Sequence, residues 1–289
     1  MKRARRGFSL AELLVAVVLL GIVGGALTRL VIDQMRFFDN IQVSRGARSA
    51  ARNSMNVVLS DLRMVQDSGG VTAIGGDNKS ITVNVPYSFG VFCGTLGAIS
   101  TVSMLPGDSA SLAMSRYAGY GWRSRTTGRY TVVPSGTLAG VSATPSRCTG
   151  TGVGQAGVAT ISMNGRSGVI YDITPAILST TTLGVPVMFY QSITYSFLAS
   201  GIYPGQFGLY RSVAGGVNEE LMAPFASTAR FRYYQTGDDT SRTTAPDLAN
   251  IRGLALVLVT EGARKPAGRT TVTQNKMMTS VFFKNTRVP

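Results

Sequence analysis

The sequence predicts an α+β protein in which a long N-terminal helix, transmembrane in its first half, packs on an antiparallel β-rich domain. Residues 8–27 are apolar apart from Ser9 and Glu12, and apolar positions recur at helical spacing up to about residue 66. After Gly70, turn residues separate short runs rich in Val, Ile, Thr, Tyr and Phe, which is typical of strands. No helical crossovers intervene between these runs, so antiparallel pairing is expected.

The predicted helix has three parts along the chain. Residues 1–7 are a basic leader, too short and too charged to fold. Residues 8–27 give about 30 Å of helix, which matches the hydrocarbon core of a membrane. Residues 28–67 are expected to continue this helix beyond the membrane and to end it near the Gly69–Gly70 pair. A helix of roughly 90 Å cannot be buried in one small domain, so its first half must pack in a bilayer or against other subunits.

Residues 68–289 are expected to form the β-rich domain. The predicted strands are 80–85, 129–133, 169–173, 193–198, 207–212, 228–234, 254–260 and 280–284. The strands at 193–198 and 207–212 should form a hairpin. The side chains expected to face the helix alternate along the late strands: Phe231, Tyr233, Leu254, Leu256 and Leu258. Residues 93–168, dominated by Gly, Ser, Thr and Ala, are predicted to be a surface-exposed insertion with limited core.

Glu12 is the residue that an ordinary membrane helix does not need. A carboxylate at the bilayer centre costs roughly 2.5–3.5 kcal/mol on insertion scales, so a positive partner is expected. Cleavage between Gly7 and Phe8 would give Phe8 a free α-amino group. In parallel, staggered copies of the helix, the Glu12 carboxylate of one subunit could then face the Phe8 amine of its neighbour, and each would neutralise the other.

The N-terminus resembles the type IV pilin-like family, which comprises type IV pilins, minor pilins and the pseudopilins of type II secretion. The matching residues are Lys2, Arg3, Arg5, Arg6, Gly7, Phe8, Ser9, Leu10 and Glu12. The resemblance implies cleavage after Gly7 by a prepilin peptidase/methyltransferase, N-methylation of Phe8, and assembly with other pilin or pseudopilin subunits through the helix. It also implies a single-pass protein of the bacterial inner membrane, with a cytoplasmic N-terminus and a periplasmic domain. No enzymatic activity is implied.

A weaker resemblance extends into the β-rich domain. The large minor pilins and minor pseudopilins of PilW type or J type carry a similar order of late strands. The segments that resemble them are 208–211, 231–234, 254–259 and 281–285. Lys284 and the long Gly/Ser-rich middle depart from the family pattern. Whether the subunit serves a pilus, a type II secretion pseudopilus or a competence filament is left open by these residues.

Two simpler interpretations account for only part of the N-terminal sequence. An uncleaved signal anchor would account for the basic leader and the apolar run, but it gives Gly7 and Glu12 no role. A secretory signal peptide could be cut near Gly24-Gly25-Ala26, and that cut would discard Glu12.

The charge balance raises a second possible function. The chain has 28 Lys and Arg against 14 Asp and Glu, and its formal net charge of +14 falls to +10 when the four basic residues of the leader are removed. Trp122, Arg123, Arg125 and Arg129 form a local basic and aromatic cluster that could contact nucleic acid. The chain would then be a DNA-binding minor pilin of a DNA-uptake filament. A solvated basic face is the simpler interpretation.

The remaining candidate sites are few. Cys93 and Cys148 could form one disulfide in an oxidising compartment, or stay as two thiols. The chain contains no histidine, and the usual catalytic constellations and cofactor motifs are missing from the sequence, so no cofactor is expected. Asp238, Asp239 and Asp247 lie in a polar loop that could bind calcium, although a solvated turn is the simpler interpretation and no metal site is predicted.

Overall fold

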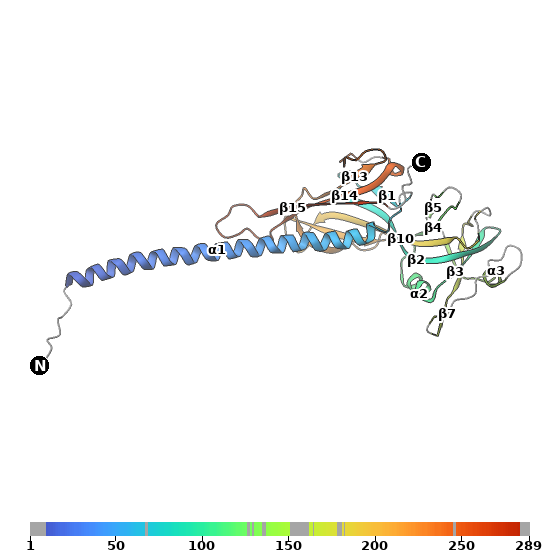
Figure 1. Cartoon of the computed structure of the whole chain (residues 1–289), viewed down its shortest axis with the longest axis horizontal. Coiled ribbons are helices and arrows are strands. Elements are labelled where there is room, and N and C mark those ends of the chain that lie inside the picture. Colours follow the sequence, from blue (N-terminus) through green and yellow to red (C-terminus); the bar gives the residue numbers. More distant parts are fainter. Residues whose placement is uncertain are drawn as a thin grey trace.

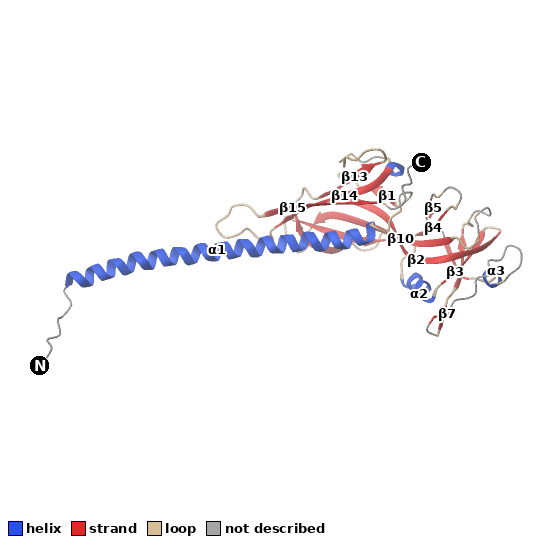
Figure 2. Ribbon diagram, in the orientation of Figure 1, coloured by secondary structure: helices blue, strands red, loops and turns tan. Residues whose placement is uncertain are grey.

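A long helix, α1 (Leu10–Leu62), extends from a β-rich body, and its first residues lie far from that body (Figure 1). The computed structural model describes residues 10–66, 69–125, 128, 130–134, 137–150, 162–163, 165–177, 181, 183–244 and 247–283. Strands make up most of the body, and α1 runs alongside part of it (Figure 2). The predicted α+β fold class is confirmed.

Helix α1 spans Leu10–Leu62, so the prediction of one long helix is confirmed over the part that the structure describes. Only its C-terminal part is buried, at Ala47, Ala50, Ala51, Ser54, Val58, Leu59 and Leu62. Small residues come first in this series, and they allow the helix axis to approach the sheet closely. The chain turns away after α1 at Gly70, where a Cβ atom would lie 1.9 Å from the carbonyl oxygen of Gln66. Only glycine fits at that position without rearrangement.

The body is built on an antiparallel sheet of 13 strands within the described residues. The elements are β1 (Val71–Ile74), β2 (Ser80–Leu96), β3 (Ile99–Met104), α2 (Pro106–Met114), β4 (Gly119–Arg123), β5 (Tyr130–Pro134), β6 (Thr137–Val141), α3 (Ser146–Thr149), β7 (Ser162–Met163), β8 (Arg166–Ser167), β9 (Ile170–Thr174), β10 (Pro186–Ala199), β11 (Phe207–Val213), β12 (Glu219–Phe225), β13 (Arg230–Gln235), the 3-10 helix η1 (Leu248–Asn250), β14 (Ile251–Glu261) and β15 (Gln274–Phe282). The main strand order is β13-β14-β12-β11-β10-β2-β3-β9-β6, with β15 paired to β14. Strands β7 and β8 form a separate pair.

Strands β2 and β10 are long enough to connect two lobes of the body. They pair antiparallel from Ser80 opposite Ser196 to Val91 opposite Pro186, with a register shift beside Pro86. Proline cannot donate to the ladder, which explains why the irregularity falls there. The predicted hairpin is confirmed, because β10 pairs with β11 from Ile193 opposite Val213 onward.

The first lobe contains the core that α1 covers. Its buried residues include Val58 and Leu62 of α1 together with Phe231, Tyr233, Leu254, Leu256 and Leu258 of β13 and β14. The prediction that these alternating side chains face the helix is confirmed. The outer face of the same three-stranded unit, β13 with β14 and β15, therefore points away from α1.

The second lobe has a core of its own, which the composition of residues 93–168 did not predict. Tyr120, Trp122, Val102 and Leu112 are buried there against Phe189 of β10. The expectation of a surface-exposed segment with limited core is wrong for these residues. A few large side chains among many small ones are sufficient to fill the space between β2, β4 and β10.

Candidate membrane and assembly segment

The N-terminal part of α1 exposes its apolar side chains on every side. Leu10 is 84% exposed and Leu20 is 78% exposed, and the consecutive residues Leu13, Leu14 and Val15 are all exposed. Exposed apolar surface of this extent marks a membrane or protein interface. Within the part of the chain that the structure describes, α1 is the one helix long and apolar enough to cross a membrane.

Glu12 lies in the first turn of α1, at the head of this apolar stretch. Ala11, Val15, Ala16 and Leu19 line a shallow hollow together with it. A carboxylate near a helix N-terminus is stabilised by the helix dipole, which lowers the cost of placing a charge there. Gly7 and Phe8 lie outside the described residues, so cleavage, methylation and the pairing of Glu12 with a Phe8 amine stay predictions.

Asp39 fixes α1 to the body at the point where the exposed apolar part ends. Its carboxylate accepts hydrogen bonds from the Arg264 guanidinium and from the backbone N–H of Ala267, the latter at 3.1 Å. The Thr273 hydroxyl lies 3.3 Å from the Asn40 side-chain oxygen. The connection between β14 and β15 is therefore held along one side of the helix. Sequence reasoning missed this contact, because nothing in the spacing of Asp39 and Arg264 relates the two positions.

Cys93 and Cys148 form a disulfide. It joins β2 to the short helix α3, and both cysteines are fully buried beside Ile170. The Arg147 guanidinium also donates to the carbonyl oxygen of Thr95 at 2.6 Å. The bond and this contact attach residues 142–150 to the second lobe.

The predicted nucleic-acid cluster is only partly at the surface. Trp122 is 4% exposed and its ring stacks on Tyr120, so it cannot stack on a base, and the prediction for this residue is corrected. Arg123 donates to the carbonyl oxygen of Gly128 at 2.9 Å, whereas Arg125 is exposed. Arg129 lies outside the described residues. Of the four residues, the structure thus places Arg123 and Arg125 near one another at the surface.

Two aspartates of the polar loop that was considered for calcium form ion pairs with arginines. Asp238 pairs with Arg242, and Asp239 pairs with Arg252. Hydrogen bonds from Thr240, together with the contact to Arg242, lower the pKa of Asp238 to about 2. Asp247 caps η1 by accepting from the Ala249 N–H. Among the described residues, no group of three acidic, cysteine or histidine side chains could hold a metal ion.

Comparison with known proteins supports the N-terminal assignment. Residues 2–28 match the family described as the prokaryotic N-terminal methylation motif. The chain therefore carries the N-terminus of a type IV pilin-like prepilin, a class whose members are generally structural subunits. The motif and the apolar part of α1 indicate anchoring in the inner membrane before assembly with pilins. No curated protein and no solved structure matches the chain.

Proposed function

We propose that the protein is a minor pilin or minor pseudopilin of a type IV pilus or a type II secretion pseudopilus. A prepilin peptidase would cut it after Gly7 and methylate Phe8, and the mature subunit would assemble through α1. The observation that carries the proposal is the methylation motif at residues 2–28, which overlaps the start of α1, the part of the helix whose apolar side chains are exposed on all sides.

The structure of α1 supports assembly over simple anchoring. The exposed apolar side chains do not stop at Leu27, but continue through Leu30, Val31 and Met35 to Phe38. This stretch is longer than the hydrocarbon core requires. Other helices would cover the excess after the subunit enters a filament.

Mass spectrometry of the mature protein tests the processing step. A methylated Phe8 at the N-terminus is the expected result. The variant Gly7→Leu should retain Met1 or the leader, because the peptidase loses its recognition residue. A wild-type N-terminus at Met1, or one that follows Ala26, would overturn the proposal in favour of a signal anchor or a signal peptide.

The DNA-uptake alternative gains no support at the cluster that suggested it. Trp122, the aromatic residue of that cluster, is in the core, and the hollow that Arg123 and Arg125 line does not include it. This cluster therefore adds no second function to the proposed role in assembly.

A further inference from the structure

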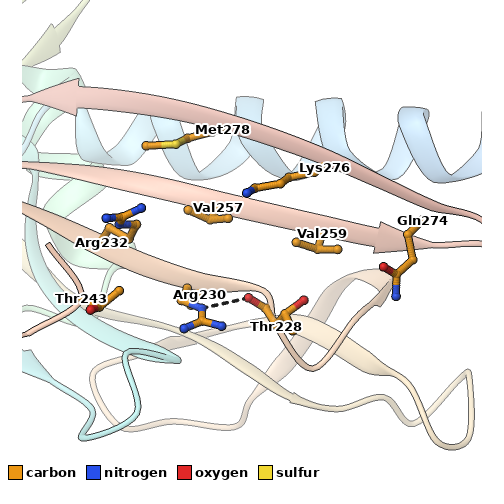
Figure 3. A pocket seen from close by; sticks show the side chains of 9 residues that line it. All are labelled: Thr228, Arg230, Arg232, Thr243, Val257, Val259, Gln274, Lys276 and Met278. Carbon is orange, nitrogen blue, oxygen red and sulfur yellow. Dashed lines mark hydrogen bonds between the residues drawn. The ribbon is translucent and has the colours of Figure 1, made fainter. Parts of the chain in front are cut away.

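The outer face of β13, β14 and β15 carries a groove that is separate from the exposed apolar part of α1. It lies on the side of these strands away from α1, and Figure 3 shows the side chains that line it. The groove has a volume of about 540 Å³ and is lined by Thr228, Arg230, Arg232, Thr243, Val257, Val259, Gln274, Lys276 and Met278.

The strand register explains why basic and apolar side chains meet here. Arg230 and Arg232 alternate with Phe231 and Tyr233, which are in the core, so both guanidinium groups are on the outer face. Val257 is opposite both Arg230 and Met278, and Lys276 is opposite Val259. Residues two apart on one strand are about 7 Å apart, and adjacent strands are about 4.8 Å apart. The three cations therefore surround an apolar floor.

The positive charge of this groove is not neutralised by carboxylates within it. Among the described residues that line it none is acidic, and the Glu261 carboxylate, beside Gln274 at one end of the groove, accepts a hydrogen bond from that side chain at 2.9 Å. Arg230 donates to the carbonyl oxygen of Thr228 at 3.1 Å, and Arg232 donates to the carbonyl oxygen of Ser241. Arg232 Nε is buried and has no hydrogen-bond partner among the described residues. Each guanidinium keeps further N–H groups with which an anion could be bound.

An aromatic ring is exposed at one end of the same face. Phe282 is 51% exposed, and its ring lies 4.8 Å from that of Tyr234. The Arg252 guanidinium lies 5.3 Å from the centre of the Phe282 ring. Phe282 is opposite Gly253, four residues along β14 from the row of Arg230 and Val257, or about 14 Å.

We propose that this face binds single-stranded nucleic acid. Arg232, Arg230 and Lys276 would contact successive phosphates, and Phe282 with the apolar floor would receive the faces of bases. Basic grooves that run beside exposed aromatic rings are the usual means of binding single strands without sequence preference. An acidic protein or polysaccharide could pair with the cations, but it has no bases to stack on the exposed ring. A duplex is disfavoured, because its bases are stacked internally and cannot lie on a flat sheet face.

The test is fluorescence anisotropy with the full chain in mild detergent and a labelled single-stranded DNA of 15 thymidines. The variant Arg230→Gln/Arg232→Gln/Lys276→Gln should weaken binding at least tenfold. It should also reduce the slope of log affinity against log salt by about 2, since each phosphate contact contributes roughly 0.7. Phe282→Ala should weaken binding about fivefold or more without changing this slope.

A charge-matched control separates a specific site from general attraction. The variant Arg63→Gln/Arg116→Gln/Arg166→Gln removes three exposed arginines that do not line the groove, and it should bind within twofold of the wild type. Because Arg232 contacts Ser241 in the fold, Arg230→Gln/Lys276→Gln is a second groove variant that leaves this contact in place.

Four results would overturn the proposal. They are equal losses in the groove and control variants, an unchanged affinity in Phe282→Ala, tighter binding of duplex than of single strands, and stronger competition by a polyuronate than by unlabelled oligonucleotide. The readout needs no filament, so its failure would leave the assembly function standing, and a failure of the processing experiment would leave this site standing.

Discussion

The hydroxyl group of Tyr195 donates a 2.5 Å hydrogen bond to the carboxylate of Asp61, near the C-terminal end of α1. The Arg211 guanidinium lies 3.5 Å from the same carboxylate oxygen. Tyr195 is fully buried in the first core, and Asp61 and Arg211 are partly buried at its edge. One carboxylate thus joins the last turn of the helix to β10 and β11, which fixes the rotation of α1 on the sheet.

The first prediction concerns the strength of this contact. Tyr195→Phe should lower the free energy of unfolding of the β-rich body by about 1 kcal/mol, the net value of one buried hydrogen bond. Asp61→Ala should cost more, about 2 kcal/mol, because it leaves both Tyr195 and Arg211 without their shared acceptor. Urea titration of the full chain in detergent measures both. In the double variant the losses should not add, since the two changes remove one interaction. Fully additive losses would show that the two side chains act independently.

The second prediction is a loss of stability at alkaline pH. Burial raises the pKa of Tyr120 to about 12, and burial together with the nearby Asp61 carboxylate raises the pKa of Tyr195 still further. An unfolded tyrosine titrates near pH 10. The unfolded chain therefore loses these protons first, so this contribution to stability is complete below pH 10 and is lost as the pH rises towards the folded pKa values. Chemical unfolding at a series of pH values above 9 measures the slope.

Tyr120→Phe serves as the control for the alkaline effect. This variant lacks one tyrosine whose protonation is linked to folding. The stability of the variant protein should therefore fall less steeply above pH 10 than that of the wild type. A slope identical to that of the wild type would mean that Tyr120 does not contribute.

The helix and the late strands could be predicted because their signals are local. Apolar residues at helical spacing predicted α1. The alternation of Phe231 and Tyr233 with arginines predicted β13 and its buried face. The same alternation placed Arg230 and Arg232 outside, which was the available signal for the basic groove. Lys276 joins them only through the pairing of β14 with β15, and that pairing is a property of the folded sheet.

The second lobe could not be predicted because its core depends on a few residues far apart in the chain. Trp122 follows glycine and tyrosine in a segment that reads as loop, yet it packs with Phe189 and Ile173 across the sheet. An aromatic residue beside arginines has the same sequence pattern in a nucleic-acid surface and in a covered strand. Only the pairing of β4 with β10 separates the two.

The third prediction concerns the disulfide. Cys93→Ser/Cys148→Ser opens a loop of 55 residues, and the chain-entropy model gives a loss on the order of 4 kcal/mol. The loss should be confined to the second lobe, because among the described residues the two cysteines cluster with Ile170, apart from the core that α1 covers. Hydrogen exchange should therefore accelerate in β3, β9 and α3 while the buried part of α1 stays protected. Uniform acceleration across both lobes would show that the two cores unfold as one unit.

The fourth prediction separates membrane insertion from assembly at Glu12. Glu12→Gln removes a charge from the head of the apolar part of α1, so insertion should be unchanged or improved. Cleavage after Gly7 should persist, since the leader and the glycine are intact. Assembly should fall, because the neighbouring Phe8 amine loses the carboxylate that we expect to neutralise it. Membrane fractionation, mass spectrometry of the N-terminus and recovery of the subunit in sheared filaments measure the three steps separately.

The variant Asp33→Asn is the matched control for Glu12→Gln. It also removes one carboxylate from α1, but at an exposed position where the partner is Arg36 in the same helix. The Asp33 charge is already paired within its own subunit, so assembly should fall much less than in Glu12→Gln. If Glu12→Gln entered filaments as well as Asp33→Asn did, the charge pair with Phe8 would be refuted. The carboxylate would then have to act within its own helix, where its position in the first turn already favours a negative charge.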